Sequence, residues 1–176
     1  LSLRRQRQMC IRDRPDTYME KIAIGSNLPK DLLDIDNGVE KNIKLLAEAK
    51  NKKISELNAC VLKRTRHDHI VKILSEMKVS INFITDGDIA GVLSVIGDQP
   101  KNDIYYSIGG GPEGVLAASA LSCFGGQIQG RLVLNEEEKI RAKKLGISDF
   151  NKKYNIEDMV KGLSLIHISE PTRPLY

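Results

Sequence analysis

The sequence predicts an α/β fold with a largely parallel sheet, and two observations lead to this class. Short apolar, β-favouring runs alternate along the chain with segments whose apolar residues recur at helical spacing. Strands that alternate with helices usually pair in parallel through right-handed crossovers. In addition, three glycines at 109–111 stand between an apolar run and an Ala- and Leu-rich segment. This predicts a strand, a tight loop and a helix start, where backbone N–H groups can hold an anion.

The first half of the chain supplies two strand–helix pairs. The apolar run 22–24 predicts a strand, and apolar residues spaced along one face predict a helix at about 39–50. A buried strand is predicted at 57–62, and helical spacing resumes over 70–77.

The second half continues the alternation. Its predicted elements are a strand at 79–85, a helix at 89–97, the strand–glycine–helix unit that begins at 103, a strand at 127–134 and a helix at 136–145. Residues 146–162 carry only weak signals.

Composition indicates a single soluble domain without nucleic-acid or membrane partners. The 176 residues can bury a sizeable core, and no apolar run approaches the roughly 20 residues that span a bilayer. Five arginines and one aspartate in 1–14 account for the whole net charge of +4. Trp is absent and only 5% of residues are aromatic, which argues against stacking platforms for single-stranded nucleic acid.

Both ends of the chain are predicted to be foreign, which leaves 15–162 as the natural domain. Residues 9–13 and 163–168 can be encoded by DNA strings that are reverse complements and resemble a transposase-adapter end of sequencing libraries. A targeting peptide fits poorly because no apolar segment follows the first arginines. We therefore expect foreign tails at 1–14 and 163–176, which resequencing across both junctions tests.

The cysteines and histidines show no metal-site spacing. Cys60 and Cys123 lie in apolar runs, which predicts buried free thiols in a reducing, cytoplasmic compartment. His67 and His69 stand two residues apart at a predicted helix start, so their side chains point in different directions. Surface or capping roles are therefore predicted for both.

Polar residues follow three of the predicted strands, and the ends of parallel strands share one edge of a sheet. The arginine fork suits phosphate, and paired carboxylates suit sugar hydroxyls or a cation. These residues are Arg64 and Arg66, Asp86 and Asp88, and Glu113 beside the glycine run. Tyr18 is a further candidate because its hydroxyl can bond a phosphate or a sugar. The convergence predicts a phosphate-handling site in the crevice where α/β folds bind ligands.

Simpler interpretations exist for each group: a structural glycine turn, a solvated charge run, helix-capping aspartates and a packing tyrosine. The glycines also fit the G-x-G-x-x-G fingerprint of a Rossmann-like dinucleotide-binding module over 109–114. That module needs an acidic residue about 20 positions later, where the chain offers Arg131 and Asn135, with Glu136 already at the next helix start. Glu113 would also repel a pyrophosphate unless a cation lay between them, and it suits a metal-dependent phosphatase better.

Five short motifs occur in register across nearly all of 15–162. They are PDTYMEK at 15–21, RTRHD at 64–68, DGDIA at 86–90, IGGGPEGV at 108–115 and QGRL at 129–132. Their order and spacing resemble class II fructose-1,6-bisphosphatase. Each motif alone is weak, whereas five in register are specific. The resemblance implies the layered α/β fold of the lithium-sensitive, metal-dependent sugar phosphatases.

The resemblance also implies a reaction and a set of site residues. The reaction is hydrolysis of the 1-phosphate of fructose 1,6-bisphosphate in gluconeogenesis and glycerol metabolism, or of sedoheptulose 1,7-bisphosphate in some members. By motif, Glu113 would ligate Mg²⁺ or Mn²⁺, and the full-length protein would be a homo-oligomer. The residues that would contact the substrate are Tyr18, Arg64, Thr65, Arg66, Asp86, Gly87, Asp88 and Gly110. The family usually carries proline in place of Thr65, and a smaller departure occurs at Gly111.

Most metal ligands of this family are acidic residues upstream of the segment that resembles 15–21, and the chain lacks that segment. We therefore expect a C-terminal portion of the enzyme that forms the sheet but does not turn over alone. The catalytic acidic residues stay unassigned, and a non-catalytic structural fragment is a third interpretation.

Overall fold

The computed structural model describes residues 18–144 and 146–160, so the expected foreign tails lie outside the described residues. The strands are β1 (Tyr18–Ile24), β2 (Asn58–Leu62), β3 (Ser80–Ile84), β4 (Ile104–Gly110), β5 (Gln127–Val133) and β6 (Lys153–Asn155). The helices are α2 (Gly38–Lys50), α3 (Asp68–Glu76), α4 (Asp88–Leu93), α5 (Gly111–Phe124), α6 (Glu136–Lys144) and α7 (Ile156–Met159). Three short 3₁₀ turns are η1 (Ile35–Asn37), η2 (Ile54–Glu56) and η3 (Thr65–His67).

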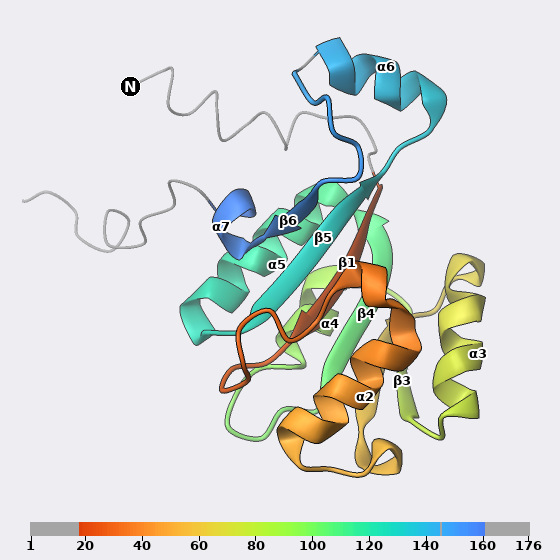
Figure 1. The fold of residues 1–176 in the computed structure, drawn as a ribbon, viewed down its shortest axis with the longest axis vertical. Coiled ribbons are helices and arrows are strands. Elements are labelled where there is room, and N and C mark those ends of the chain that lie inside the picture. Colours follow the sequence, from red (N-terminus) through yellow and green to blue (C-terminus); the bar gives the residue numbers. More distant parts are fainter. Residues whose placement is uncertain (1–17, 145, 161–176) are drawn as a thin grey trace, which may run out of the picture.

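The six strands form one sheet in the order β3-β2-β4-β1-β5-β6, with helices on both faces (Figure 1). β2 pairs in parallel with β3 and β4, and β5 runs in the same direction because both β4 and β5 are antiparallel to β1. The predicted α/β class is thereby confirmed. The alternation of elements did not predict that β1 lies antiparallel between β4 and β5, or that β6 is antiparallel to β5.

The antiparallel β1 has a consequence for the position of Tyr18. In the β1–β4 ladder, Tyr18 is paired with Gly110, the last residue of β4. The start of β1 therefore lies at the same edge of the sheet as the carboxyl ends of β2, β3 and β4.

Two apolar layers hold the helices against the sheet. Side chains alternate across β1, so that Ile22 and Ile24 join the layer under α2 and α3, whereas Met19 and Ala23 join the layer under α4, α5 and α7. Strands buried on both faces read as continuous apolar runs, which is why the sequence located β2 and β4. No helix within the described ranges is both long and apolar enough to cross a membrane.

Three local predictions differ from the structure. α4 ends at Leu93 rather than near 97. β6 and α7 were not predicted because elements of three and four residues are too short for periodicity to show. Cys60 is buried as predicted, but Cys123 is exposed, because α5 is apolar on both its inner and outer sides.

Candidate functional site

The ends of β1, β2, β3 and β4 surround a hollow of about 380 Å³, called here the strand-end hollow. Its lining consists of Tyr18, Leu62, Arg64, Arg66, Asp86, Gly87, Asp88, Ile89, Gly109, Gly110 and Glu113. Of the residues assigned to the site from sequence, all but Thr65 are in this lining. Thr65 is exposed at the start of η3. The structure thus brings together side chains from four distant segments, while their roles remain predictions.

Arg66 is held at the rim of the strand-end hollow by two contacts. Its Nε donates a 2.6 Å hydrogen bond to the carbonyl oxygen of Ile108, and its guanidinium lies 5.0 Å from the centroid of the Tyr18 ring. The second contact is within the distance of a cation–π interaction. The two terminal amino groups of Arg66 can donate hydrogen bonds to a phosphate. Arg64 is exposed and lines the same hollow.

His67 is fully buried and stands at the N-cap of α3 without a side-chain cap hydrogen bond, so the predicted surface or capping role was wrong for this residue. Its Nε2 accepts a 2.8 Å hydrogen bond from the N–H of Ile108, and its Nδ1 lies 2.5 Å from the carbonyl oxygen of Leu62. Because Nε2 is the acceptor, Nδ1 carries the proton and donates. The ring therefore ties the end of β2 to β4. His69 is exposed, as predicted.

Burial lowers the pKa of His67, which makes stability depend on pH. The unfolded chain binds a proton before the folded chain does, so the free energy of unfolding should fall as the pH drops below about 6.5. The paired carboxylates of Asp88 and Asp103 have pKa values below 3.8, so their protonation lowers the free energy of unfolding only at pH values below this range. Urea unfolding between pH 7 and 5 should show this slope in the wild type and in His69→Gln but not in His67→Gln. An equal slope in His67→Gln would contradict the role given to His67.

No loop separates β4 from α5, in contrast to the prediction, because β4 ends at Gly110 and α5 begins at Gly111. None of the three consecutive glycines has a positive φ. They are needed for close approach instead: a Cβ on Gly109 would overlap the Asp88 carboxylate, and one on Gly110 would overlap Glu113. The two carboxylates therefore lie directly against the glycine backbone.

A buried lysine that sequence reasoning missed lies behind this junction. Lys21 donates from Nζ to the Asp88 carboxylate and, at 3.0 Å, to the carbonyl oxygen of Gly110. The other carboxylate oxygen of Asp88 accepts hydrogen bonds from Tyr105 and, at 2.6 Å, from Ser107. Burial holds the pKa of Lys21 below its usual value. Burial opposes ionisation of Asp88 as well, but Lys21 and the two hydroxyls outweigh it and lower the Asp88 pKa.

Glu113 can supply one ligand of a metal site. It is exposed in the first turn of α5, where the helix dipole favours a negative charge, and its carboxylate oxygens suit a hard cation. Over residues 18–144 and 146–160, no three His, Cys, Asp or Glu side chains form a group that could hold a metal. The described residues fit one side of a metal centre but do not complete it.

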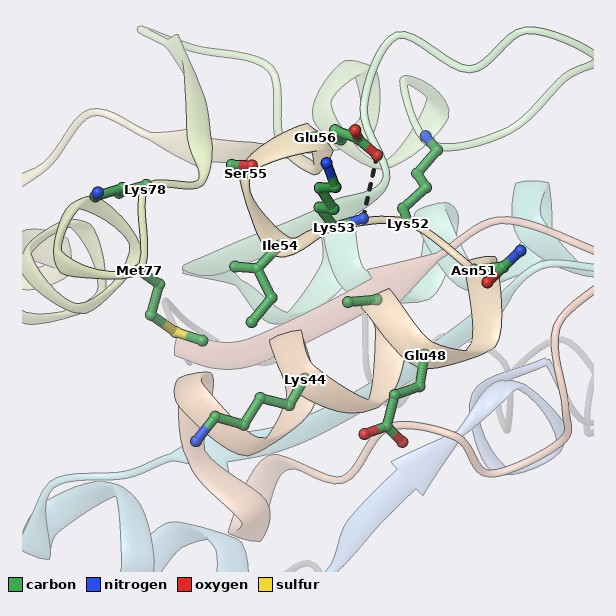
Figure 2. Close-up of a pocket in the computed structure, with 11 residues that line it drawn as sticks. Lys44, Glu48, Asn51, Lys52, Lys53, Ile54, Ser55, Glu56, Met77 and Lys78 are labelled. Carbon is green, nitrogen blue, oxygen red and sulfur yellow. Dashed lines mark hydrogen bonds between the residues drawn. The ribbon is translucent and has the colours of Figure 1, made fainter.

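A second hollow, of about 800 Å³, lies between η2 and the C-terminal ends of α2 and α3, and is called here the helix-end hollow. Figure 2 shows Ile54 and Met77 turned inward, whereas Lys44, Glu48 and Lys78 point away. Lys44 is also paired with Glu40. Since its charged groups do not converge, this hollow lacks the arrangement expected of an active site.

The geometry does not match a dinucleotide-binding module. In such a module a strand leads into the glycine-rich turn, a helix follows, and the next strand lies beside the first. Here the corresponding strands are β4 and β5, and β1 lies between them. Arg131 stands near the position where a ribose-binding acid is required, and it is paired with Glu20 and Asp36. These contacts fasten η1 to the sheet rather than face the glycines.

Comparison with known proteins identifies the family. A family model described as "Bacterial fructose-1,6-bisphosphatase, glpX-encoded" matches residues 4–169. The chain belongs to this fructose-1,6-bisphosphatase family. The resemblance drawn from the five motifs is thereby confirmed, and the α/β layers of the described residues are consistent with it.

Two curated relatives of the chain are also named as class 2 fructose-1,6-bisphosphatases. The chain is 34% identical over 166 residues to the fructose-1,6-bisphosphatase class 2 of Haemophilus influenzae, with 86% of this chain and 49% of the relative covered. It is 33% identical to a D-fructose 1,6-bisphosphatase class 2/sedoheptulose 1,7-bisphosphatase of Synechococcus sp., with 86% and 47% covered. The chain therefore spans about half the length of these curated relatives.

Proposed function

We propose that the chain is the sugar-phosphate-binding portion of a metal-dependent phosphatase that hydrolyses the 1-phosphate of fructose 1,6-bisphosphate. The observation that carries this proposal is the strand-end hollow, which gathers two arginines, a tyrosine, an aspartate pair and Glu113 at one edge of the sheet. Sedoheptulose 1,7-bisphosphate is a second candidate substrate because one relative is named for both activities. The gluconeogenic role and the homo-oligomeric state remain predictions from the resemblance, and the cytoplasmic location remains a prediction from the cysteines.

In this proposal the arginines bind the phosphate that does not react. Ile108 and Tyr18 orient the Arg66 side chain in the absence of a ligand, so the side chain loses less conformational freedom when it binds a phosphate. Asp86 and the Tyr18 hydroxyl would bond the sugar. Binding of the remote phosphate would position the scissile one toward Glu113.

Glu113 would supply one carboxylate to Mg²⁺ or Mn²⁺. The bound ions would neutralise the scissile phosphate, activate water and stabilise the leaving alkoxide. The remaining acidic ligands would come from the part of the relatives' length that this chain does not span. We therefore propose that this chain alone binds the sugar phosphate but does not hydrolyse it.

Phosphate release tests the function. The full-length protein that contains this chain should release one phosphate per fructose 1,6-bisphosphate in Mg²⁺ or Mn²⁺, and EDTA should stop the reaction. Fructose 6-phosphate, which lacks the 1-phosphate, should release none. Metal-independent release would contradict the metal role, and robust turnover by this chain alone would contradict the division of the site.

Removing the Arg66 side chain should weaken substrate binding more than turnover. A charge-assisted hydrogen bond contributes about 1.5–3 kcal/mol, so Arg66→Ala should raise KM about 10- to 100-fold. Because the remote phosphate also positions the scissile one, kcat should fall as well, but by less than KM rises. Arg141→Ala, on the exposed side of α6, is the matched control and should leave KM unchanged. An unchanged KM in Arg66→Ala would remove Arg66 from the substrate site.

A further inference from the structure

Lys21 is an unusual residue for its place in the fold. It lies in the middle of β1 with 1% of its surface exposed, in the same strand as the buried Ile22, Ala23 and Ile24. A lysine is rarely buried to this extent unless its charge is paired, because removal from water is costly. Its hydrogen-bond partners therefore indicate the structural role of the buried charge.

Those partners come from two elements that both border the strand-end hollow. Asp88 opens α4 directly after Gly87, and Gly110 ends β4 immediately before α5. The ammonium group of Lys21 donates one hydrogen bond to the Asp88 carboxylate and another to the Gly110 carbonyl oxygen. It is therefore a single connection between the first turn of α4 and the β4–α5 junction.

Asp86 and Asp88 differ in the use of their carboxylates, although both flank Gly87. Asp86 is exposed and accepts a 2.8 Å hydrogen bond from the N–H of Gly87. The Asp88 side chain is 8% exposed and takes hydrogen bonds on both oxygens, from Lys21 on one and from Tyr105 and Ser107 on the other. Three donors from β1 and β4 therefore hold the Asp88 carboxylate in place, whereas the Asp86 carboxylate is bonded to the N–H of the next residue.

We propose that Lys21 is a positioning residue of the phosphatase site, which anchors both the Asp88 carboxylate and the Gly110 carbonyl at the edge of the strand-end hollow. This inference rests on the proposed function for its kinetic consequences.

The position of Gly110 matters because Glu113 packs against it so closely that a Cβ at Gly110 would overlap the Glu113 carboxylate. A shift of the Gly110 backbone therefore displaces the proposed metal ligand. Displacements of about 1 Å in an active site can cost about 100-fold in rate. Lys21 would thus act on catalysis without touching the substrate.

Kinetics of the full-length protein test the positioning role. Lys21→Met is expected to lower kcat about 100-fold with little change in KM, since the arginines are not displaced. The matched control is Lys50→Met, which weakens another lysine–aspartate pair, at Asp103, away from the hollow. It should lower the thermal midpoint but leave kcat unchanged. A kcat retained by Lys21→Met at a temperature where it is folded would overturn the proposal.

A double variant separates positioning from stability. In Lys21→Met alone, Asp88 is left buried without its cation. Lys21→Met with Asp88→Asn removes both charges but keeps an acceptor for Tyr105 and Ser107, so it should recover part of the thermal midpoint. kcat should stay low, because the bond to the Gly110 carbonyl is still missing. Recovery of kcat together with the midpoint would show that the pair only stabilises the fold and would overturn the inference.

Paired substitutions of the two aspartates test the anchoring. Asp88→Asn should lower the thermal midpoint because Asp88 is paired with the buried lysine, whereas Asp86→Asn should leave the midpoint unchanged. An unchanged midpoint in Asp88→Asn would overturn the anchoring role.

Amide NMR spectra of the chain give a readout that needs no turnover. Lys21→Met should shift the resonances of Gly110 and Glu113, and Lys50→Met should not. Unshifted resonances would overturn the inference even if the wild-type enzyme is active. A wild-type enzyme that does not hydrolyse fructose 1,6-bisphosphate would refute the proposed function alone.

Discussion

Glu113→Gln in the full-length enzyme is expected to lower kcat for fructose 1,6-bisphosphate on the order of 10³-fold, because a lost metal ligand removes several kcal/mol of transition-state stabilisation. The amide keeps the shape that packs against Gly110 but loses the charge that a cation requires. The free energy of unfolding should change by less than about 1 kcal/mol, since an exposed carboxylate at a helix start contributes no more than this.

Glu137→Gln is the matched control. Glu137 also lies in the first turn of an exposed helix, α6, but it does not line the strand-end hollow. It should leave both kcat and stability unchanged. Retained turnover in Glu113→Gln, measured at saturating Mg²⁺ or Mn²⁺, would reject the metal role of Glu113.

Gly109→Ala is expected to destabilise the fold by about 3 kcal/mol, the cost of breaking a buried ion pair. The new Cβ would overlap the Asp88 carboxylate, and Asp88 cannot move aside without leaving Lys21. Equilibrium unfolding in urea measures the change.

Gly130→Ala provides the comparison for Gly109→Ala. A Cβ on Gly130 would meet the Met19 sulfur at 2.6 Å, but a flexible thioether can rotate away, so the cost should be about 1 kcal/mol. Equal losses in the two variants would mean that the Asp88 carboxylate is not held as rigidly as its contacts indicate.

The order of strands and helices through α6 was predictable because apolar spacing reports which faces are buried. Ile43 and Leu46 of α2 and Ile70 and Leu74 of α3 are buried, at the spacing that predicted both helices. The gathering of Arg64, Asp86 and Gly110 was also predictable, because parallel strands end at one edge. A local pattern was sufficient in each case.

The direction of β1, the burial of Lys21 and His67 and the role of the glycines could not be predicted, because they depend on contacts between residues far apart in sequence. The direction of β1 is set by pairing with β4 and β5, whose residues stand 80 or more positions later in the chain. Lys21 and His67 look like surface residues in sequence, since a buried polar residue is revealed only by partners such as Asp88 and Ile108. The glycine run predicts a tight loop, whereas Gly109 and Gly110 let the Asp88 and Glu113 carboxylates approach the backbone.

A titration of the ¹⁵N-labelled chain with fructose 6-phosphate, followed by amide chemical shifts, tests whether this chain binds the sugar phosphate. We expect the shifts to concentrate at the strand-end hollow, at Arg66, Gly87 and Gly110, and Arg66→Ala to weaken them. Shifts centred on the helix-end hollow, or none at millimolar ligand, would contradict binding at the strand-end hollow.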